Sequence, residues 1–328
     1  MQNQTIKVQS PTRIDLAGGT LDCWPINAIL NPVSTINVAI SAYTSCTLSP
    51  REDGRIIIRS KDWDQSYEFD SLEQALNDNE EHFIFFREHL AYWKPETGFE
   101  MECASDSPVG GGLGGSSSLS ISIFKAFAQW MGVEIEPYSA VRTCSGIEAK
   151  ILKTPTGTQD YFPPLLGGVN IIDYEFGWPQ VQSLPIDKAK ISGNISIFFT
   201  GRAHQSGINN WQVMKKFIEG DAKTVNALTT IQKIADETKM AVIEADWQRL
   251  PDLFQREFAA RMDLAESFSS PEIEDLAKIA LENGGEAIKI CGAGGGGCVF
   301  VWSQPEHRQQ VVDACVRAGY KHLDVQLI

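Results

Sequence analysis

The segment 107–118, SPVGGGLGGSSS, has the residue types and spacing that an anion-binding loop needs. Five of the six residues 110–115 are glycine, and three serines follow at 116–118. Glycine takes up positive φ readily and lets the backbone approach a ligand with no Cβ in the way. An apolar run of helical length follows at once, so free N–H groups and the positive end of a helix dipole are expected to converge on this loop. We therefore predict a phosphate-binding loop, in which a serine caps the helix or its hydroxyl binds Mg²⁺.

This loop fits neither of two common phosphate-binding patterns well. The NTPase pattern GxxxxGK[ST] requires a lysine, and the nearest one, Lys125, lies deep within the expected helix. Residues 110–115 do match GxGxxG, and Glu134 falls near the acidic position of a dinucleotide site. However, residues 138–152 have a helical pattern where a dinucleotide-binding fold needs its next parallel strand. A dinucleotide-dependent oxidoreductase therefore remains an alternative, and so does a plain flexible linker.

Charged side chains beside glycines near residue 15 form a second candidate group. Arg13 and Asp15 lie two residues apart, so in an extended segment they share one face. Gly18 and Gly19 predict a turn, and Asp22 follows it. The pattern suits a binding site, and it equally suits a surface turn with two solvated charges.

A third candidate is Asp160 in the segment TPTGTQDYFPPLLGG. Gly157, two prolines and the pair Gly167–Gly168 bracket the aspartate, and we expect a rigid loop rather than a helix here. A carboxylate on a constrained loop suits catalysis, because loops on a rigid scaffold carry many functional residues. A lone loop aspartate is also common as a cap or turn residue, so this alternative stays open.

The elements that must position these residues can be predicted from periodicity. Alternating β-branched residues predict strands in the first half at 5–9, 33–49, 54–60 and 98–105. The second and third of these strands are expected to form an antiparallel ladder. Apolar faces at helical spacing predict three helices. The first covers 71–94, the second follows the glycine loop directly, and the third covers 137–152, where Glu148 lies.

A change of composition at 183–190 indicates a domain boundary. Beyond it we expect strands at 195–201, 286–290, 298–302 and 322–328. Helices are expected along 207–268, with breaks near Gly220 and Leu250–Pro251, and then at 270–285 and 305–319. A second glycine run, 292–297, joins two of the strands. Strands interleaved with helices predict an α+β fold, with helices packed on a largely antiparallel sheet.

The overall composition limits the classes of partner. The 328 residues carry a formal charge of -14 and are 43% apolar, which predicts one large or two medium domains with a sizeable core. The negative charge argues against nucleic acid and anionic membranes as partners. The sequence shows no apolar run of membrane length and no signal peptide, and its seven cysteines are scattered without CxxC spacing. We therefore expect a cytoplasmic protein with reduced cysteines.

Three segments in order resemble the motifs of the GHMP kinase superfamily, which includes galactokinase, homoserine kinase, mevalonate kinase and phosphomevalonate kinase. They are PTRIDLAGGTLD, SPVGGGLGGSSS and KICGAGGGGCVFVW, with TGTQD between the second and the third. The resemblance covers essentially the whole chain. It implies a two-domain α+β architecture, in which residues 1–185 resemble ribosomal protein S5 domain 2, residues 186–328 are ferredoxin-like, and the site lies between them.

The resemblance also implies roles for individual residues. The loop residues that would hold the phosphates of ATP are Pro108, Gly110, Gly111, Gly112, Leu113, Gly114, Gly115, Ser116 and Ser117. Ser116 and Glu148 match the magnesium ligands of the family. Asp160 matches the aspartate beside the acceptor hydroxyl, and Arg13 matches the basic residue of the first motif. The substrate site would comprise Asp22, Gly18, Gly19 and Thr20, with Gly294 and Gly295 at its floor.

Short matches and departures from the family motifs bear on the acceptor. Gly115 stands where a serine is more usual, and Gly19 and Thr20 replace the Glu-His pair of galactokinases, which argues against galactose. AGGTLD, TGTQDYF and FFTGRAHQS look most like the bacterial D-glycero-D-manno-heptose 7-phosphate kinase branch, which phosphorylates a sugar at its anomeric hydroxyl. The phosphate already on such a substrate needs cationic contacts, for which Arg202 and His204 are candidates, with a solvated loop as the alternative.

These features predict a kinase that uses ATP and Mg²⁺ and transfers a phosphoryl group to an alcohol group of a small-molecule sugar or sugar phosphate. A monomer or homodimer is expected. A mevalonate-type acceptor is one alternative, and a non-catalytic relative that binds a sugar or nucleotide is another. Loop N–H groups and Mg²⁺ would neutralise the phosphates. Asp160, beside Arg13, would act as a base or only orient the acceptor hydroxyl, and both possibilities stay open.

Overall fold

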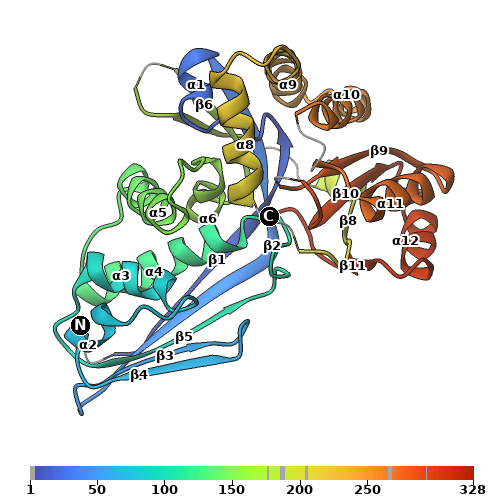
Figure 1. Cartoon of the computed structure of the whole chain (residues 1–328). Helices are drawn as coiled ribbons and strands as arrows, with labels where there is room; N and C mark the ends of the chain where they lie inside the picture. The colour runs from blue at the N-terminus through green and yellow to red at the C-terminus, as the bar shows by residue number, and fades with distance from the viewer. Residues whose placement is uncertain (1–3, 176, 185–188, 204–205, 265–267, 293) are drawn as a thin grey trace.

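Two β-sheets form the framework of the computed structural model, which describes residues 4–175, 177–184, 189–203, 206–264, 268–292 and 294–328 (Figure 1). The first sheet has the strand order β4-β3-β5-β2-β6-β7, and β1 pairs with β2. Its strands are β1 (Ile6–Ala17), β2 (Val33–Pro50), β3 (Ile56–Ser60), β4 (Gln65–Phe69), β5 (Phe99–Ser105), β6 (Val169–Tyr174) and β7 (Gln180–Leu184). The second sheet is antiparallel in the order β11-β8-β10-β9. Its strands are β8 (Ile195–Phe199), β9 (Gly285–Ile290), β10 (Cys298–Ser303) and β11 (Lys321–Leu323).

Helices cover both sheets. In the first half, α4 (Gly115–Met131) packs on β1 and β2, and α5 (Pro137–Leu152) packs beside α4. In the second half, α9 (Ala222–Ile243) packs on β2, α10 (Leu250–Met262) packs on β9, and α11 (Pro271–Glu282) packs beside α12 (Arg308–Arg317). The remaining helices are α1 (Ile26–Ile29), α2 (Leu72–Asn77), α3 (Ile84–Trp93), α6 (Pro163–Leu166), α7 (Ala189–Ser192) and α8 (Ser206–Ile218).

One apolar core joins the two halves of the chain. It contains Ile14 of β1, Ile231 of α9, Phe254 of α10 and Phe300 of β10, all of them buried. The rings of Phe254 and Phe300 meet edge to face, with 5.1 Å between their centroids. Because α9 packs on the first sheet and α10 on the second, loops of both sheets are held against each other near the middle of the molecule (Figure 1).

The last residues of the chain return to the first sheet. Along one edge of β2, residues 33–38 pair with β6 and residues 44–50 pair with β5, which leaves residues 39–43 between them. Residues 326–328 cover the first part of this stretch: the N–H of Ser41 donates to the carbonyl of Gln326 (2.8 Å), and the N–H of Ile328 donates to that of Ala39 (3.0 Å). On the opposite edge of β2, Ala39 is the partner of Arg13 in β1. The tail therefore supports the sheet directly behind Arg13.

The strand predictions are right in position more often than in partner. The antiparallel ladder expected between 33–49 and 54–60 is wrong, because β5 lies between β2 and β3 and runs parallel to β3. The two helices between β4 and β5 provide the crossover that allows β5 to insert there. The first strand extends to Ala17, well beyond the predicted 5–9, and the final strand covers only Lys321–Leu323.

One helix prediction misses an interruption, and another places an interruption a few residues too late. The helix expected at 71–94 is two helices, because Asp78 is extended and the Glu80 carboxylate accepts from the N–H of Phe83 (2.9 Å), which diverts a backbone donor. The break expected at Leu250–Pro251 lies instead at residues 244–249. Pro251 stands in the first turn of α10, where its missing N–H has no intrahelical partner to lose.

The predicted domain boundary at 185/186 falls at residues 185–188, outside the described residues, and it stays a prediction. The two sheets lie on either side of it in the sequence. Within the described part of the chain, no helix combines the length and apolar character needed to span a bilayer.

Candidate active site

A cavity of about 280 Å³ lies where loops of the two halves meet. Its described walls come from β1 and the turn after it, the end of β3 and the residues after it, α3, the end of β5, the glycine loop, the start of α4, residues 148–160, α8, α10 and the residues after β9. The predicted site residues that line it are Arg13, Gly19, Thr20, Asp22, Pro108, Gly110, Gly111, Gly112, Gly114, Gly115, Ser116, Ser117, Glu148 and Asp160. The fold therefore brings together side chains that are up to about 150 residues apart in sequence.

The glycine loop is held in shape from both sides. Gly110, Gly112 and Gly114 have φ values of 66°, 73° and 71°, a region that side chains other than glycine rarely adopt. The carbonyl of Leu113 accepts from the N–H of Arg13 (3.0 Å), and the carbonyl of Gly111 accepts from the N–H of Cys298 (2.7 Å). Strands β1 and β10 thus fix the loop, and its curvature depends on glycine at these positions.

The expected capping role of the serines is wrong. Gly114 is the N-cap of α4, and no side chain caps this helix. The helix begins at Gly115, so Ser116 to Ser118 already lie inside its first turn. Ser118 is buried and its hydroxyl donates to the carbonyl of Pro11 (2.9 Å), whereas Ser116 is exposed at the cavity.

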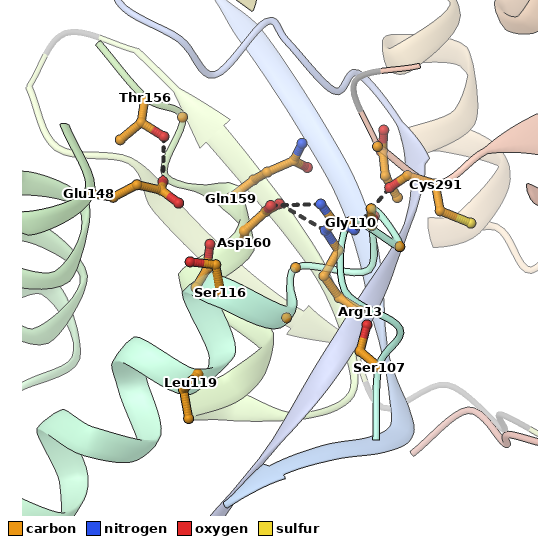
Figure 2. A pocket seen from close by; sticks show the side chains of 18 of the residues that line it. Arg13, Ser107, Gly110, Ser116, Leu119, Glu148, Thr156, Gln159, Asp160 and Cys291 are labelled. Carbon is orange, nitrogen blue, oxygen red and sulfur yellow. Dashed lines mark hydrogen bonds and ion pairs between the residues drawn. The ribbon is translucent and has the colours of Figure 1, made fainter. Parts of the chain in front are cut away.

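Arg13 and Asp160 form a two-pronged ion pair at the centre of the cavity (Figure 2). The Arg13 Nε donates to Asp160 Oδ1 (2.8 Å) and Nη2 donates to Oδ2 (2.6 Å). Nη1 donates to the carbonyls of Gly112 (2.6 Å) and Cys291 (2.9 Å). Burial acts against the charge of Arg13, but the attraction of Asp160 and Asp15 outweighs it and raises the pKa of the guanidinium. Arg13 and Asp15 are both buried, so the alternative of a solvated surface turn is wrong.

Asp160 lies on a short helical turn, not on the irregular loop that its sequence predicts. Residues Gln159–Tyr161 form a single 3₁₀ turn, and α6 follows directly. Pro163 and Pro164 occupy first-turn positions of α6, where a missing N–H is tolerated, so the two prolines start this helix. The Asp160 side chain is 27% exposed and faces the cavity.

Glu148 and Ser116 lie on the same side of the cavity as Asp160 (Figure 2). Glu148 projects from α5, and its Oε2 accepts from the hydroxyls of Thr156 (2.6 Å) and Tyr161 (2.8 Å). Burial raises the pKa of the Glu148 carboxyl. A carboxylate and a hydroxyl are hard oxygen ligands of the kind that Mg²⁺ prefers, and Mg²⁺ in kinases typically keeps waters and phosphate oxygens as its other ligands. Their chemistry fits Mg²⁺, and among the described residues no cluster of three or more acidic, His or Cys side chains provides an all-protein cage.

The turn after β1 presents Asp22 to the cavity. Gly18 and Thr20 have φ values of 83° and 78°, and these two left-handed residues fold the chain sharply. Asp22 Oδ2 accepts from the N–H of Gln159 (3.0 Å), which ties the turn to the segment that carries Asp160. A Cβ at Gly157 would collide with the Asp22 carboxylate, so this position requires glycine. Burial raises the pKa of Asp22 to about 6.

Five other predicted residues are not among those that line the cavity: Gly18, Leu113, Gly294, Gly295 and Arg202. Gly294 and Gly295 pack against the Phe268 backbone, and Gly292 of the same run reaches the cavity instead. Arg202 is exposed, and its Nη1 lies 3.6 Å from Glu272 Oε2. His204, the second candidate for a substrate phosphate, lies outside the described residues.

The sequence analysis missed several residues of the cavity wall. Trp63, Phe85 and Leu119 form an apolar end, where Asp62 Oδ1 accepts from the N–H of Ser105 at the entry to the glycine loop. A tryptophan in the polar segment KDWDQS was a signal that could have been used. Arg261 of α10 also lines the cavity, and nothing in its local sequence distinguishes it. The remaining lining residues come mostly from the same segments.

Comparison with known proteins agrees with this geometry. The family model of the GHMP kinases N terminal domain matches residues 81–168, and that of the GHMP kinases C terminal matches residues 241–322. The D-glycero-alpha-D-manno-heptose 7-phosphate kinase of Campylobacter jejuni is 31% identical over 320 residues, covering 95% of this chain and 93% of that protein. A D-glycero-D-manno-heptose 1-phosphate kinase structure from Bacteroides thetaiotaomicron has a TM-score of 0.78 at 21% identity, covering 99% of this chain and 96% of the other. Lactococcus lactis galactokinase, solved with galactose, has a TM-score of 0.81 at 17% identity, covering 99% and 94%.

The chain belongs to the GHMP kinase family. It is therefore a phosphotransferase with the two-domain fold of mixed α and β structure that this family has, and ATP is its phosphoryl donor. The predicted family, fold class and enzyme class are confirmed. The oxidoreductase alternative is wrong, and Glu134, the acidic residue on which it depended, is exposed and is not among the residues that line the cavity.

Proposed function

We propose that this GHMP kinase phosphorylates a sugar phosphate of the heptose 7-phosphate class at its anomeric hydroxyl. The observation that carries the proposal is the Arg13–Asp160 pair, which faces the same cavity as the glycine loop and Asp22. The cavity then holds three adjacent groups. They are the glycine loop for the donor phosphates, Asp160 for the acceptor hydroxyl and Asp22 for other sugar hydroxyls. The 31% identity to the Campylobacter jejuni enzyme supports this acceptor class over galactose or mevalonate.

The donor half of the site is formed by the glycine loop. Backbone N–H groups at the end of the glycine loop and in the first turn of α4, with the positive end of this helix, bind the β- and γ-phosphates of ATP, while the N–H of Gly111 donates within the loop to the carbonyl of Pro108. Ser116 and Glu148 would hold Mg²⁺, which would supply positive charge to the phosphates. The nucleobase lies toward the apolar end at Trp63, Phe85 and Leu119, because Asp62 ties that end to the start of the loop.

The acceptor half is organised by two carboxylates. Asp160 accepts a hydrogen bond from the reacting hydroxyl and receives its proton as the phosphoryl group is transferred. Arg13 holds Asp160 in one orientation through two hydrogen bonds and places positive charge beside the reacting phosphate. Asp22 binds other hydroxyls of the sugar. We also propose the boundary at 185/186 and a cytoplasmic location, which the seven free cysteines support, and we retain a monomer or homodimer as the expected assembly.

The metal assignment predicts that Ser116→Ala and Glu148→Gln each increase the Mg²⁺ concentration needed for half-maximal rate. Removing a residue that holds a metal, or one that supports its ligands, typically costs roughly 10- to 100-fold in affinity. Titration of Mg²⁺ at saturating ATP and acceptor measures the effect. Glu134→Gln, an exposed glutamate beyond the end of α4, is the matched control. If Glu148→Gln keeps the wild-type metal dependence, Glu148 only supports Thr156 and Tyr161.

The raised pKa of Asp22 predicts a pH limb in acceptor use. With a pKa of about 6, the carboxylate is ionised above that pH and loses its negative charge below it. We expect kcat/KM for the acceptor to fall as pH decreases through about 6, because this parameter reports groups of the free enzyme and of the free acceptor, whose own phosphate titrates in the same range. Asp22→Asn should raise the acceptor KM far more than the ATP KM and reduce this limb to the part that the acceptor phosphate causes. Asp236→Asn, at an exposed carboxylate on α9 whose pKa is also raised, should keep the wild-type limb. Equal changes in both KM values would make Asp22 structural.

A coupled ADP-release screen tests the function itself. The acceptors are heptose 7-phosphate, unphosphorylated heptose, galactose and mevalonate, and phosphorus NMR of the product identifies the phosphorylated position. The proposal expects the highest kcat/KM with the heptose 7-phosphate and an anomeric phosphate in the product. Preference for mevalonate, or phosphorylation at another hydroxyl, would refute it, and ATP binding without turnover of any acceptor would favour a non-catalytic relative.

A further inference from the structure

Four charged side chains are buried together where β1 meets the second half of the chain. They are Asp15 of β1, Glu257 and Arg261 of α10, and Lys289 of β9, with side-chain exposures of 5%, 0%, 1% and 0%. Arg261 Nη2 lies 3.2 Å from Asp15 Oδ2 and 2.9 Å from Glu257 Oε1. Lys289 Nζ lies 3.4 Å and 2.9 Å from the same two oxygens. The two positive and two negative charges balance.

A buried cluster of charges contributes little net free energy to the stability of a fold. Burying ions costs free energy that their mutual attraction only partly returns, and well-packed apolar residues often do as well. In addition, Asp15 Oδ1 and Glu257 Oε2 are buried with no hydrogen-bond partner among the described residues. Nothing in the phosphoryl transfer derived above uses these four residues, so their role must be sought in what else they contact.

Arg261 also contacts the turn after β1, residues 18–22, which carries Asp22 and is called the acceptor turn below. Its Nη2 donates to the carbonyl of Gly19 (3.0 Å), and Nε remains on Glu257 Oε1 (3.0 Å). A Cβ at Gly19 would collide with Asp15 Oδ2 and lie 2.7 Å from Arg261 Nη2. The cluster therefore occupies the space where a side chain of residue 19 would stand, and it fixes the turn three residues before Asp22.

The same strand makes a second contact of this kind. Arg13 and Asp15 lie on one face of β1, and Arg13 donates to the carbonyl of Cys291 while Asp15 pairs with Lys289. The Arg13–Asp160 pair and the acceptor turn are thus both held by residues of the second half. These residues are Lys289 of β9 and Cys291, which directly follows β9.

We propose that Arg261 is a positioning residue for the acceptor: from the second half of the chain it fixes the turn 18–22, so that Asp22 meets the sugar. The inference rests on the proposed role of Asp22. Arg261 acts through the Gly19 carbonyl and does not contact reacting atoms. Its guanidinium is suited to this because Nε donates to Glu257 while Nη2, one bond further out, donates to Gly19, and the ammonium of a lysine ends one bond short of the Nη2 position.

The test compares Arg261→Lys with Arg256→Lys. Arg256 lies on the same helix, but it is partly exposed and pairs with Glu237 on the surface, with 2.7 Å between Nη2 and Oε1. Loss of a hydrogen bond from a charged group predicts that Arg261→Lys raises the acceptor KM about 10- to 100-fold, with the ATP KM and kcat within about threefold of wild type. Arg256→Lys should match wild type in both.

Hydrogen exchange without substrate gives a readout independent of catalysis. The N–H of Leu21 bonds the carbonyl of Gly18 (3.0 Å), and the N–H of Cys23 bonds that of Thr20 (3.2 Å). In Arg261→Lys, these two amides should exchange faster, while the amides of α10 and β9 keep wild-type rates. If Arg261→Lys does not fold, Gly19→Ala perturbs the same contact from the turn and should show the same KM split and exchange pattern.

The outcomes separate the two proposals. Unchanged acceptor KM and unchanged exchange at Leu21 and Cys23 overturn the inference, and so do equal rises in both KM values with faster exchange throughout α10. A third outcome is faster exchange confined to the turn in Arg261→Lys, while the wild-type protein phosphorylates no sugar. This outcome refutes the proposed function and shows that Arg261 holds the turn for another purpose.

Discussion

Asp160→Asn is expected to lower kcat by roughly 10²- to 10⁴-fold while leaving the ATP KM nearly unchanged, which is the usual cost of removing a positioned acid–base group. The amide cannot receive the proton of the acceptor hydroxyl. It also loses one of the two charge-assisted hydrogen bonds to Arg13, so the orientation of the hydroxyl is relaxed as well. Steady-state kinetics with saturating acceptor and varied ATP measure both parameters.

Asp173→Asn is a closely matched control. Asp173 on β6 is as exposed as Asp160, at 27%, and its ion pair with Lys239 has the same N···O distance of 2.6 Å as the Arg13–Asp160 pair. It is not among the residues that line the cavity. A kcat within a few-fold of wild type for Asp160→Asn, or an equal loss for Asp173→Asn, would remove the catalytic assignment.

Arg13→Ala is expected to lose a similar factor, because it removes the group that orients Asp160 and the positive charge beside the phosphate. If the two residues act as a unit, the double variant loses much less than the product of the single losses. Multiplicative losses would mean that Arg13 and Asp160 contribute independently.

Gly112→Val is expected to raise the ATP KM on the order of 10- to 100-fold, since a strained left-handed residue costs about 1–3 kcal/mol. Gly112 has a φ of 73°, and its carbonyl accepts from Arg13 Nη1 (2.6 Å), so a β-branched side chain strains the loop and the contact with Arg13 together. Isothermal titration with a non-hydrolysable ATP analogue separates binding from catalysis.

Gly54→Val provides the control for backbone strain alone. Gly54 has a φ of 75° in an exposed turn, and a Cβ there would meet no atom within 4 Å. Gly54→Val should lower the melting temperature about as much as Gly112→Val does, and it should leave the ATP affinity unchanged. Wild-type ATP affinity in a folded Gly112→Val protein would contradict the assignment of the loop.

The glycine loop could be predicted from sequence because its requirement is local. Positive φ at Gly110, Gly112 and Gly114 depends on the residue type itself, and the helix that follows is visible as an apolar run. Asp160 was found for a related reason, since it stands in the short segment TGTQD that resembles a family motif, and Glu148 was found because it matches a family ligand on a helix visible in the sequence. The structure then brings these local segments to one cavity, while their individual roles stay predictions.

The strand order and the role of Arg261 could not be predicted, because both depend on contacts between residues far apart in the sequence. The insertion of β5 between β2 and β3 is decided by packing of the whole sheet, and each strand alone has the same alternating pattern in either order. Arg261 lies 246 residues from Asp15 and looks like any arginine on an amphipathic helix. The short helical turn at Asp160 was missed because prolines were interpreted as loop residues, although they also start helices.

The return of residues 326–328 to β2 has a consequence for synthesis on the ribosome. The edge of β2 at Ala39 to Ser41 lacks its partner until the last residues of this sequence have emerged. At roughly 5–20 residues per second, that interval lasts roughly 15 to 60 seconds after β2 itself is made. During this time an incomplete sheet presents unpaired backbone groups, which are a template for pairing with other chains. The nascent chain should therefore need chaperone protection during this interval, and the sheet behind Arg13 should be complete only once residues 326–328 have emerged.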